Sequence, residues 1–395
     1  MTADAPASNP LVTPPFRSLL PLYAGGMLGP LGTMIVTPMF PELRESFGVT
    51  TSAASLSVSV YLFPFAAFLL ISGTIGERFG RRRVVRITFL VYAASSVLCA
   101  LAPSFVPFLI GRALQGVANA FITPLLLAGL AEVVNPSQLG RTVGRYSSMQ
   151  MLGSTLAPAI GGVAADFNWR YSMWAVAGIA ALLSLRPPPG DPRPAYNPPP
   201  IRPLLSRRVL TIALAAFVAA SGPMAATVLV GVKARDGLLM TATGAGMLIM
   251  VGNLVASSLG SFWGGMLDRV GLRRFGLGAA TAALVVVFIL GLAQSVGVFA
   301  AVWVITAIAV NIVTVVLQVL GSTTMPSNRG GALSLILAFR FAGFAVAPVV
   351  LVPLYTTQGD TAFVAMAAIG VAALLALMAA ITVNAPASTA PAPNQ

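Results

Sequence analysis

Two arginines lie inside long apolar stretches of the chain, where a charged side chain is costly. Arg112 follows the apolar run 105–111, and Arg340 stands eleven residues after Arg329. A guanidinium at the centre of a membrane helix costs at least about 2.5–3.5 kcal/mol on insertion scales. Both arginines are therefore expected to face a watery cavity and to bind a solute there. The alternative for each is a structural role, such as donating hydrogen bonds to backbone carbonyls of a neighbouring helix.

Neutral polar residues accompany these arginines. Gln115 and Asn119 follow Arg112 by three and seven positions, which places all three on one face of a helix. Such residues could line a cavity or could simply join helices by hydrogen bonds. The predicted cavity residues are Thr33, Tyr61, Arg112, Gln115, Asn119, Thr123, Gln150, Asn253, Asn311, Gln318 and Arg340.

A charged, glycine-rich loop occurs twice. GTIGERFGRRR fills 73–83 and GGMLDRVGLRR fills 264–274, at an offset of 191 residues. GSTLAP at 153–158 and GFAVAP at 343–348 match at an offset of 190, so an internal duplication is indicated. The charged loop residues are expected to form a cytoplasmic network that latches the two halves when the cavity faces outward, and the alternative is a solvated topology anchor. The predicted members are Gly73, Glu77, Arg78, Gly80, Arg81, Glu132, Arg141, Asp268 and Arg273.

A stripe of small residues surrounds a proline within 141–165. Its members are Gly153, Ala157, Pro158, Gly161 and Gly162. Small residues at helical spacing let backbones approach closely, and the proline removes one backbone hydrogen bond and favours a bend. We interpret the stripe as a helix-bending motif, with close packing as the alternative.

The composition decides which elements must carry these residues. Hydrophobic residues make up 57% of the 395 residues and charged residues 8%, with a mean hydropathy of +0.89. Soluble proteins carry about 25% charged residues, so a soluble protein is excluded. A membrane helix needs about 20 mainly apolar residues. Twelve segments qualify, namely 17–40, 52–76, 84–102, 105–133, 141–165, 169–185, 209–232, 240–267, 275–294, 297–325, 330–356 and 361–383.

A proline-rich stretch divides these segments into six plus six. The predicted fold is an all-α membrane protein whose twelve transmembrane helices form two six-helix halves. Because each copy of the repeat holds an even number of spans, a pseudo-two-fold axis along the membrane normal should relate them. The expected regions are a tail at 1–16, bundles at 17–185 and 209–383, a linker at 186–208 and a tail at 384–395.

Basic residues concentrate on one side of this topology. With the N-terminus inside, seventeen of the 23 basic residues lie inside and four outside. The positive-inside rule then places both termini in the cytoplasm, and we expect a multi-pass protein of a bacterial inner membrane. The net charge of +13 is explained by topology and by contact with anionic lipid heads, and a nucleic-acid partner is not expected.

At these motifs the chain resembles the major facilitator superfamily over residues 17–383. The loop 73–83 resembles the signature between spans 2 and 3, with Glu77 where the family usually has Asp, and FLIGRALQGVANA at 108–120 resembles the span 4 signature. GSTLAPAIGG at 153–162 resembles the span 5 signature of drug:proton antiporters, with Ala157 in place of Gly. The resemblance implies a twelve-span exporter of small organic molecules that works by alternating access and is coupled to protons.

The acidic residues depart from that implied mechanism. None of the ten lies deep in an expected span, and the chain has no histidine, so no cavity group titrates near neutral pH. Glu42 and Glu45, at the end of the first span, are the nearest candidates for proton coupling, with a solvated loop as the favoured alternative for both and for Asp166. The alternative function is therefore a sugar or organic anion permease, or a facilitator, without proton coupling. Two arginines without a carboxylate predict a neutral, zwitterionic or anionic substrate.

Nothing in the residue pattern indicates catalysis. The chain lacks histidine, its single cysteine, Cys99, allows no internal disulfide, and the loop 73–83 lacks the Gly-Lys-Ser/Thr ending of a phosphate-binding loop. We expect no enzyme activity, no cofactor and no metal. The expected partners are a small-molecule substrate, a proton and the lipid bilayer, with the protein as a monomer.

Overall fold

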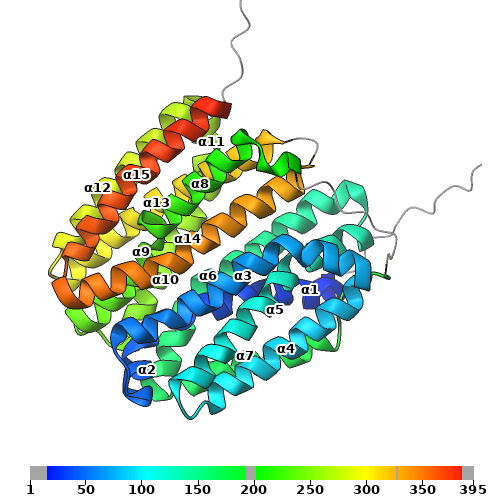
Figure 1. Ribbon diagram of the computed structural model, residues 1–395, viewed down its shortest axis with the longest axis horizontal. Helices are drawn as coiled ribbons and strands as arrows, with labels where there is room; N and C mark the ends of the chain where they lie inside the picture. Colours follow the sequence, from blue (N-terminus) through cyan, green and yellow to red (C-terminus); the bar gives the residue numbers. More distant parts are fainter. Residues whose placement is uncertain (1–15, 193–201, 326–327, 385–395) are drawn as a thin grey trace, which may run out of the picture.

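A computed structural model describes residues 16–192, 202–325 and 328–384, and these residues form a bundle of helices (Figure 1). The expected tails, except Phe16 and Asn384, and the centre of the expected linker lie outside the described residues. The first half of the bundle consists of α1 (Phe16–Met34), η1 (Thr37–Met39), α2 (Phe40–Phe47), α3 (Thr51–Phe79), α4 (Arg81–Leu101), α5 (Phe105–Val133), η2 (Pro136–Gln138), α6 (Leu139–Phe167) and α7 (Arg170–Ser184).

The second half follows the linker. It consists of η3 (Arg202–Leu205), α8 (Arg207–Ser221), η4 (Pro223–Ala225), α9 (Ala226–Val232), η5 (Lys233–Gly237), α10 (Ala242–Ser258), α11 (Gly260–Val270), α12 (Leu272–Leu292), α13 (Val296–Thr324), α14 (Arg329–Gln358) and α15 (Thr361–Asn384). All twelve expected segments fall on these helices. The fold is therefore the expected all-α membrane bundle of two six-helix halves.

The helices are suited to a membrane by length and composition. Eight of the described helices could each cross one, or ten if each of two bent pairs counts as a single span. The bends are 43° between α8 and the segment Pro223–Gly237, and 51° between α10 and the segment Phe262–Val270. The other two expected spans are α6 and the 15-residue α7.

The duplication is visible in the backbone. Gly80, between α3 and α4, has a φ of +88°, and Gly271, between α11 and α12, has a φ of +87°. This region of φ is strained for residues with a Cβ atom, so glycine ends the helix at both places. The shared conformation, 191 residues apart, confirms the repeat that the sequence predicts.

The repeat also governs how helices pack within each half. A Cβ atom on Gly153 of α6 would lie 2.4 Å from the carbonyl oxygen of Met27 in α1. A Cβ atom on Gly343 of α14 would lie 2.2 Å from the carbonyl oxygen of Phe217 in α8. All four positions match at an offset of 190, so each half uses a glycine to bring the same pair of helices into backbone contact.

Two helices of each half pack against the other half. Helix α14 lies along α3, and α10 lies along α6. The repeat relates α3 to α10 and α6 to α14, so these two contacts are equivalent. Figure 1 shows these four helices between the outer ones. We call the end of the bundle that holds residues 184–192 and 202–207 the linker end, and the opposite end, which holds α2 and η5, the α2 end.

Prediction for helix packing. The Gly116→Ala substitution should lower the free energy of unfolding by about 1–3 kcal/mol, because the new Cβ would lie 2.0 Å from the carbonyl oxygen of Tyr61. The matched control is Gly178→Ala, since a Cβ there meets nothing within 4 Å. The apparent Tm of the purified protein should fall for the first variant and stay level or rise for the second. Equal Tm values for the two variants would contradict this packing.

Candidate functional site

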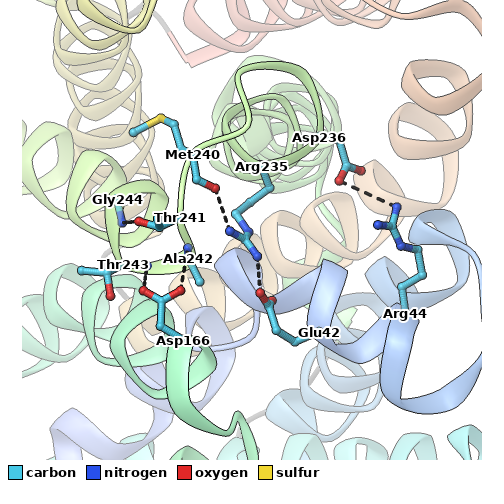
Figure 2. A network of polar contacts seen from close by, with 10 residues as sticks. All are labelled: Glu42, Arg44, Asp166, Arg235, Asp236, Met240, Thr241, Ala242, Thr243 and Gly244. Atoms are coloured by element: carbon cyan, nitrogen blue, oxygen red, sulfur yellow. Dashed lines mark hydrogen bonds and ion pairs between the residues drawn. The ribbon is translucent and has the colours of Figure 1, made fainter.

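Charged residues of both halves meet at the α2 end (Figure 2). Glu42 of α2 forms an ion pair with Arg235 of η5. Arg44 of α2 lies 3.8 Å from Asp236, and the Thr51 hydroxyl donates a hydrogen bond of 3.2 Å to the same carboxylate. Each of these contacts joins the first half to the second, so together they fasten this end of the bundle.

Asp166, at the end of α6, caps a helix of the other half. Its two carboxylate oxygens accept hydrogen bonds of 3.0 Å from the backbone N–H groups of Ala242 and Thr243, in the first turn of α10 (Figure 2). The first N–H groups of a helix have no partner within the helix and carry a partial positive charge. A carboxylate from the opposite half therefore satisfies them, and the two halves become mutually dependent here. We call Glu42, Arg44, Thr51, Asp166, Arg235 and Asp236 the latch.

The latch is not uniformly exposed. The side chains of Arg235 and Glu42 are 13% and 21% exposed, whereas those of Arg44 and Asp236 are 48% and 25% exposed. Exposed ion pairs contribute about 0–1 kcal/mol, and removing one member of a buried pair costs more because it leaves an unpaired charge. The pair of Glu42 with Arg235 is thus the principal ionic contact of the latch. The guanidinium of Arg235 also donates to the carbonyl of Met240 at 2.7 Å.

Small residues bring α6 and α10 into backbone contact beside the latch, at the interface between the two halves, which we call the seam. A Cβ atom on Gly162 would lie 2.2 Å from the carbonyl oxygen of Ala242, and one on Gly246 would lie 2.2 Å from that of Pro158. Gly161, in contrast, faces the residue that follows α1, because a Cβ there would lie 2.0 Å from the carbonyl oxygen of Ile35. The small residues of the predicted bending motif therefore pack both on the second half and on the first helix of their own half. Helix α6 continues through Pro158 without a break, and Ala157 is fully buried.

The charged loop at the linker end forms a network within one half. Arg81 pairs with Glu77 at 2.9 Å and with Glu132 at 2.6 Å, and all three residues belong to the first half. The backbone N–H of Arg82 donates to the carbonyl of Gly190, so the linker covers this network. Gly73 has open space around it. Four further members of the predicted network, Arg78, Arg141, Asp268 and Arg273, are exposed.

Within the described residues, every hydrogen bond and ion pair that joins the two halves lies at the α2 end. Asp268 and Arg273 of the second loop form no ion pair in that part of the chain. These two residues therefore show no pairing across the halves within the described ranges, and the latch at the linker end stays a prediction.

Arg112 is fully buried inside the first half. Its Nε donates to the carbonyl of Ser57 at 3.1 Å, and its Nη1 donates to the carbonyl of Gly32 at 2.8 Å and to Gln115 at 2.7 Å. The guanidinium also stacks 4.5 Å from the ring centre of Tyr61. These bonds to carbonyls of α1 and α3 correspond to the structural alternative that the sequence left open.

The repeat supplies a neutral counterpart of Arg112. Trp303 occupies the equivalent position of α13, and its indole N–H donates at 3.1 Å to the carbonyl of Leu248, which is the equivalent of Ser57. Gly252, the equivalent of Tyr61, leaves room for the indole ring. In each half, therefore, the N–H group of a large side chain donates to the carbonyl at the equivalent backbone position. This correspondence supports a structural role for Arg112.

Three further predicted cavity residues lie within the same bundle. The Tyr61 hydroxyl lies 3.2 Å from that of Tyr92 and 3.3 Å from the carbonyl oxygen of Gly29. The Thr33 hydroxyl donates to the same carbonyl at 2.9 Å, and a Cβ on Gly29 would meet Asn119. All are buried, so five predicted cavity residues, including Arg112 and Gln115, form one polar cluster inside the first half.

The remaining predicted cavity residues lie elsewhere and are less buried. Gln150 of α6 donates to the Thr123 hydroxyl at 3.3 Å, and both residues are partly exposed. Asn253, Asn311 and Arg340 are partly exposed, and Gln318 is exposed. The structure therefore separates a buried cluster in the first half from a dispersed set that includes Arg340.

Sequence reasoning missed the latch and one buried pair. The sequence predicts solvated positions for Glu42 and Asp166 and gives no partner for Lys233. Lys233 is 2% exposed, lies 2.7 Å from Asp360 and donates to the carbonyl of Gly291. The available signal was the presence of opposite charges in four connections expected on the same side of the membrane.

The sequence is similar to known membrane transporters over part of its length. A family model described as the Major Facilitator Superfamily matches residues 22–259. An uncharacterised MFS-type transporter of Bacillus subtilis, YceJ, is 30% identical over 242 residues, which is 58% of this chain and 62% of that protein. The puromycin resistance protein pur8 of Streptomyces alboniger is 28% identical over 179 residues, which is 44% of this chain and 36% of that protein. The chain thus spans less than two thirds of the length of these relatives.

The fold has well-matched solved counterparts. A bacterial homologue of the human lysosomal transporter Spinster, solved in an inward-facing and unoccupied conformation, has a TM-score of 0.77. The match covers 95% of this chain and 99% of that one at 17% identity. Since the family model covers more than half of the sequence and the fold agrees over nearly all of it, the chain is a multi-pass membrane protein that belongs to the major facilitator superfamily.

Proposed function

We propose that the protein exports small organic molecules across a bacterial cytoplasmic membrane by alternating access, with its linker end in the cytoplasm. The observation that carries this proposal is the gathering of all described polar contacts between the halves at the α2 end. A carrier that alternates must close one end while the other admits solute. In this assignment the latch is the outer gate, and the protein is closed to the outside.

The relatives support export. The protein most informative by name confers puromycin resistance, and its match covers 44% of this chain. The structural neighbour described as inward-facing supports the same state for this chain. The excess of basic residues at the linker end supports its cytoplasmic location.

Proton coupling is the less direct part of the proposal. The acidic residues of the latch, Glu42, Asp166 and Asp236, occupy the gate, and protonation of a gate carboxylate would weaken its ion pair or helix cap. A proton taken up from outside would then favour opening to the outside. The alternative is a sugar or organic anion permease, or a facilitator, without proton coupling. It is favoured by the absence of acidic residues from the middle of the described spans.

Prediction for export. Cells that overproduce the protein should accumulate less puromycin, or less of another compound from a panel of antibiotics and dyes, than cells with an empty vector. A protonophore should abolish the difference, because coupled export needs the proton gradient. The matched control is cells that overproduce the Ser52→Cys, Thr356→Cys variant, whose disulfide should hold the α2 end shut. Retention of the difference after protonophore treatment would favour the facilitator, and faster uptake in overproducing cells would contradict export.

Prediction for alternating access. The hydroxyls of Ser52 and Thr356 lie 3.1 Å apart across the halves, so the pair Ser52→Cys and Thr356→Cys should form a disulfide in a Cys99→Ala background. The disulfide should stop transport, because it prevents opening at the α2 end, and a reductant should restore it. Each single cysteine variant should be unaffected by oxidation. Transport at an undiminished rate with the disulfide formed would refute this gate.

A further inference from the structure

The membrane-embedded part of the described chain holds cations without carboxylates. The nine acidic residues within the described ranges all lie in a connection, in the short α2 or within two residues of the end of a helix. Arg112 and Arg340, in contrast, lie well inside α5 and α14. The bundle interior therefore carries positive charge that no carboxylate of the described residues neutralises.

The two interior arginines differ in what they contact. Arg112 has carbonyl, amide and aromatic partners in its own half, and the repeat replaces it with a neutral tryptophan. Arg340 has no hydrogen bond and no ion pair within the described residues, and its Nε is buried without an acceptor. Its guanidinium carbon lies 5.1 Å from the centre of the Phe341 ring. Arg112 thus has three hydrogen-bond acceptors, although its Nη2 is buried without one, whereas Arg340 has no acceptor within the described residues.

Arg340 stands where the two halves meet. The neighbouring ring of Phe341 packs edge-on against Phe65 of α3, with 4.7 Å between ring centres, across the seam between the halves. Eleven residues separate Arg340 from the start of α14, which is about 16 Å along the helix and near the middle of a bilayer. Through the repeat, Arg340 corresponds to the partly exposed Gln150 of α6. The two should therefore lie at the same depth on opposite sides of the pseudo-two-fold axis.

The face of α14 that carries Arg340 is turned toward α13. Leu333 and Ile336 approach Gly321 of α13, and Arg340 follows them by seven and four residues, which is the spacing of one helix face. The residue is partly exposed, so it is not sealed within the packed interior of the bundle. A position at the seam, at mid-depth and off the lipid face is where carriers of this repeat type hold their solutes.

An uncompensated guanidinium at this depth is costly, and a solute of opposite charge would remove that cost. We propose that Arg340 binds the negatively charged group of the transported molecule, so that the substrates are organic anions that carry a carboxylate, sulfonate or phosphate. The planar guanidinium matches such groups with two parallel hydrogen bonds. Gln150 offers a neutral amide opposite, which suits a solute with a single charged end. This inference rests on the proposed transport function and names its substrate class.

Two dyes with one ring system test the inference. Fluorescein carries a free carboxylate and is anionic, whereas rhodamine 6G has an esterified carboxyl group and is cationic. Their binding to the purified full-length protein in lipid nanodiscs is measured by fluorescence anisotropy, with empty nanodiscs subtracted. Wild-type protein should bind fluorescein at least ten times more tightly than rhodamine 6G.

Substitutions assign the charge preference to one residue. Arg340→Gln should weaken fluorescein binding at least tenfold, Arg340→Lys should retain part of it, and the exposed control Arg86→Gln should bind as wild type does. Removal of an unpaired buried charge should leave the apparent Tm unchanged or higher, so a loss of binding with an undiminished Tm separates recognition from folding.

The outcomes separate this inference from the proposed function. Undiminished fluorescein binding by Arg340→Gln, preference of the wild type for rhodamine 6G, or no binding of fluorescein would each overturn the anion site. Export of other compounds by the same protein would leave the transport function standing in those cases. Arg340-dependent binding without any efflux would support the anion site and count against export.

Discussion

A charge in a membrane interior must be paired, hydrogen-bonded or in contact with water, and this constraint orders the structure. At the α2 end, opposite charges from two halves meet in the latch. At the linker end, Arg81 gathers two carboxylates of one half. Between the ends, Arg112 donates to two backbone carbonyls of its own half, and Arg340 has no hydrogen bond within the described residues. This distribution of partners is the basis on which we propose a gate, a scaffold and a binding site.

The internal repeat explains why the gate joins the halves. Helix α14 of the second half packs on α3 of the first, and the repeat-related helix α10 packs on α6. The interface between the halves therefore consists of two equivalent helix pairs. Within each half, equivalent glycines keep α1 on α6 and α8 on α14 at backbone contact. Each half is therefore a closely packed unit. In the proposed mechanism each half would move as such a unit, and the polar contacts and small-residue packing at the α2 end would oppose its opening.

The fold followed from the sequence because length, apolarity and repeat are local or periodic signals. All twelve helical segments and the two loop glycines at 80 and 271 could be predicted in this way. The contacts of single polar residues could not. Arg112 was expected in a cavity, since sequence gives depth but not which carbonyls are within reach, and Glu42 was taken as solvated because its partner lies 193 residues away. Arg340 was placed correctly at depth, whereas its lack of partners needed the structure.

In the proposed transport cycle, the latch holds the α2 end shut while the linker end is open. Distances between spin labels would measure both ends, with one pair at Glu45 and Leu239 for the α2 end and another at Ser148 and Thr323 for the linker end, in a Cys99→Ala background. A short distance is expected for the first pair, and Arg235→Gln should lengthen it while the second distance shortens. Unchanged distance distributions in Arg235→Gln, or a first pair that is already widely separated in the unsubstituted latch, would contradict the proposed gate.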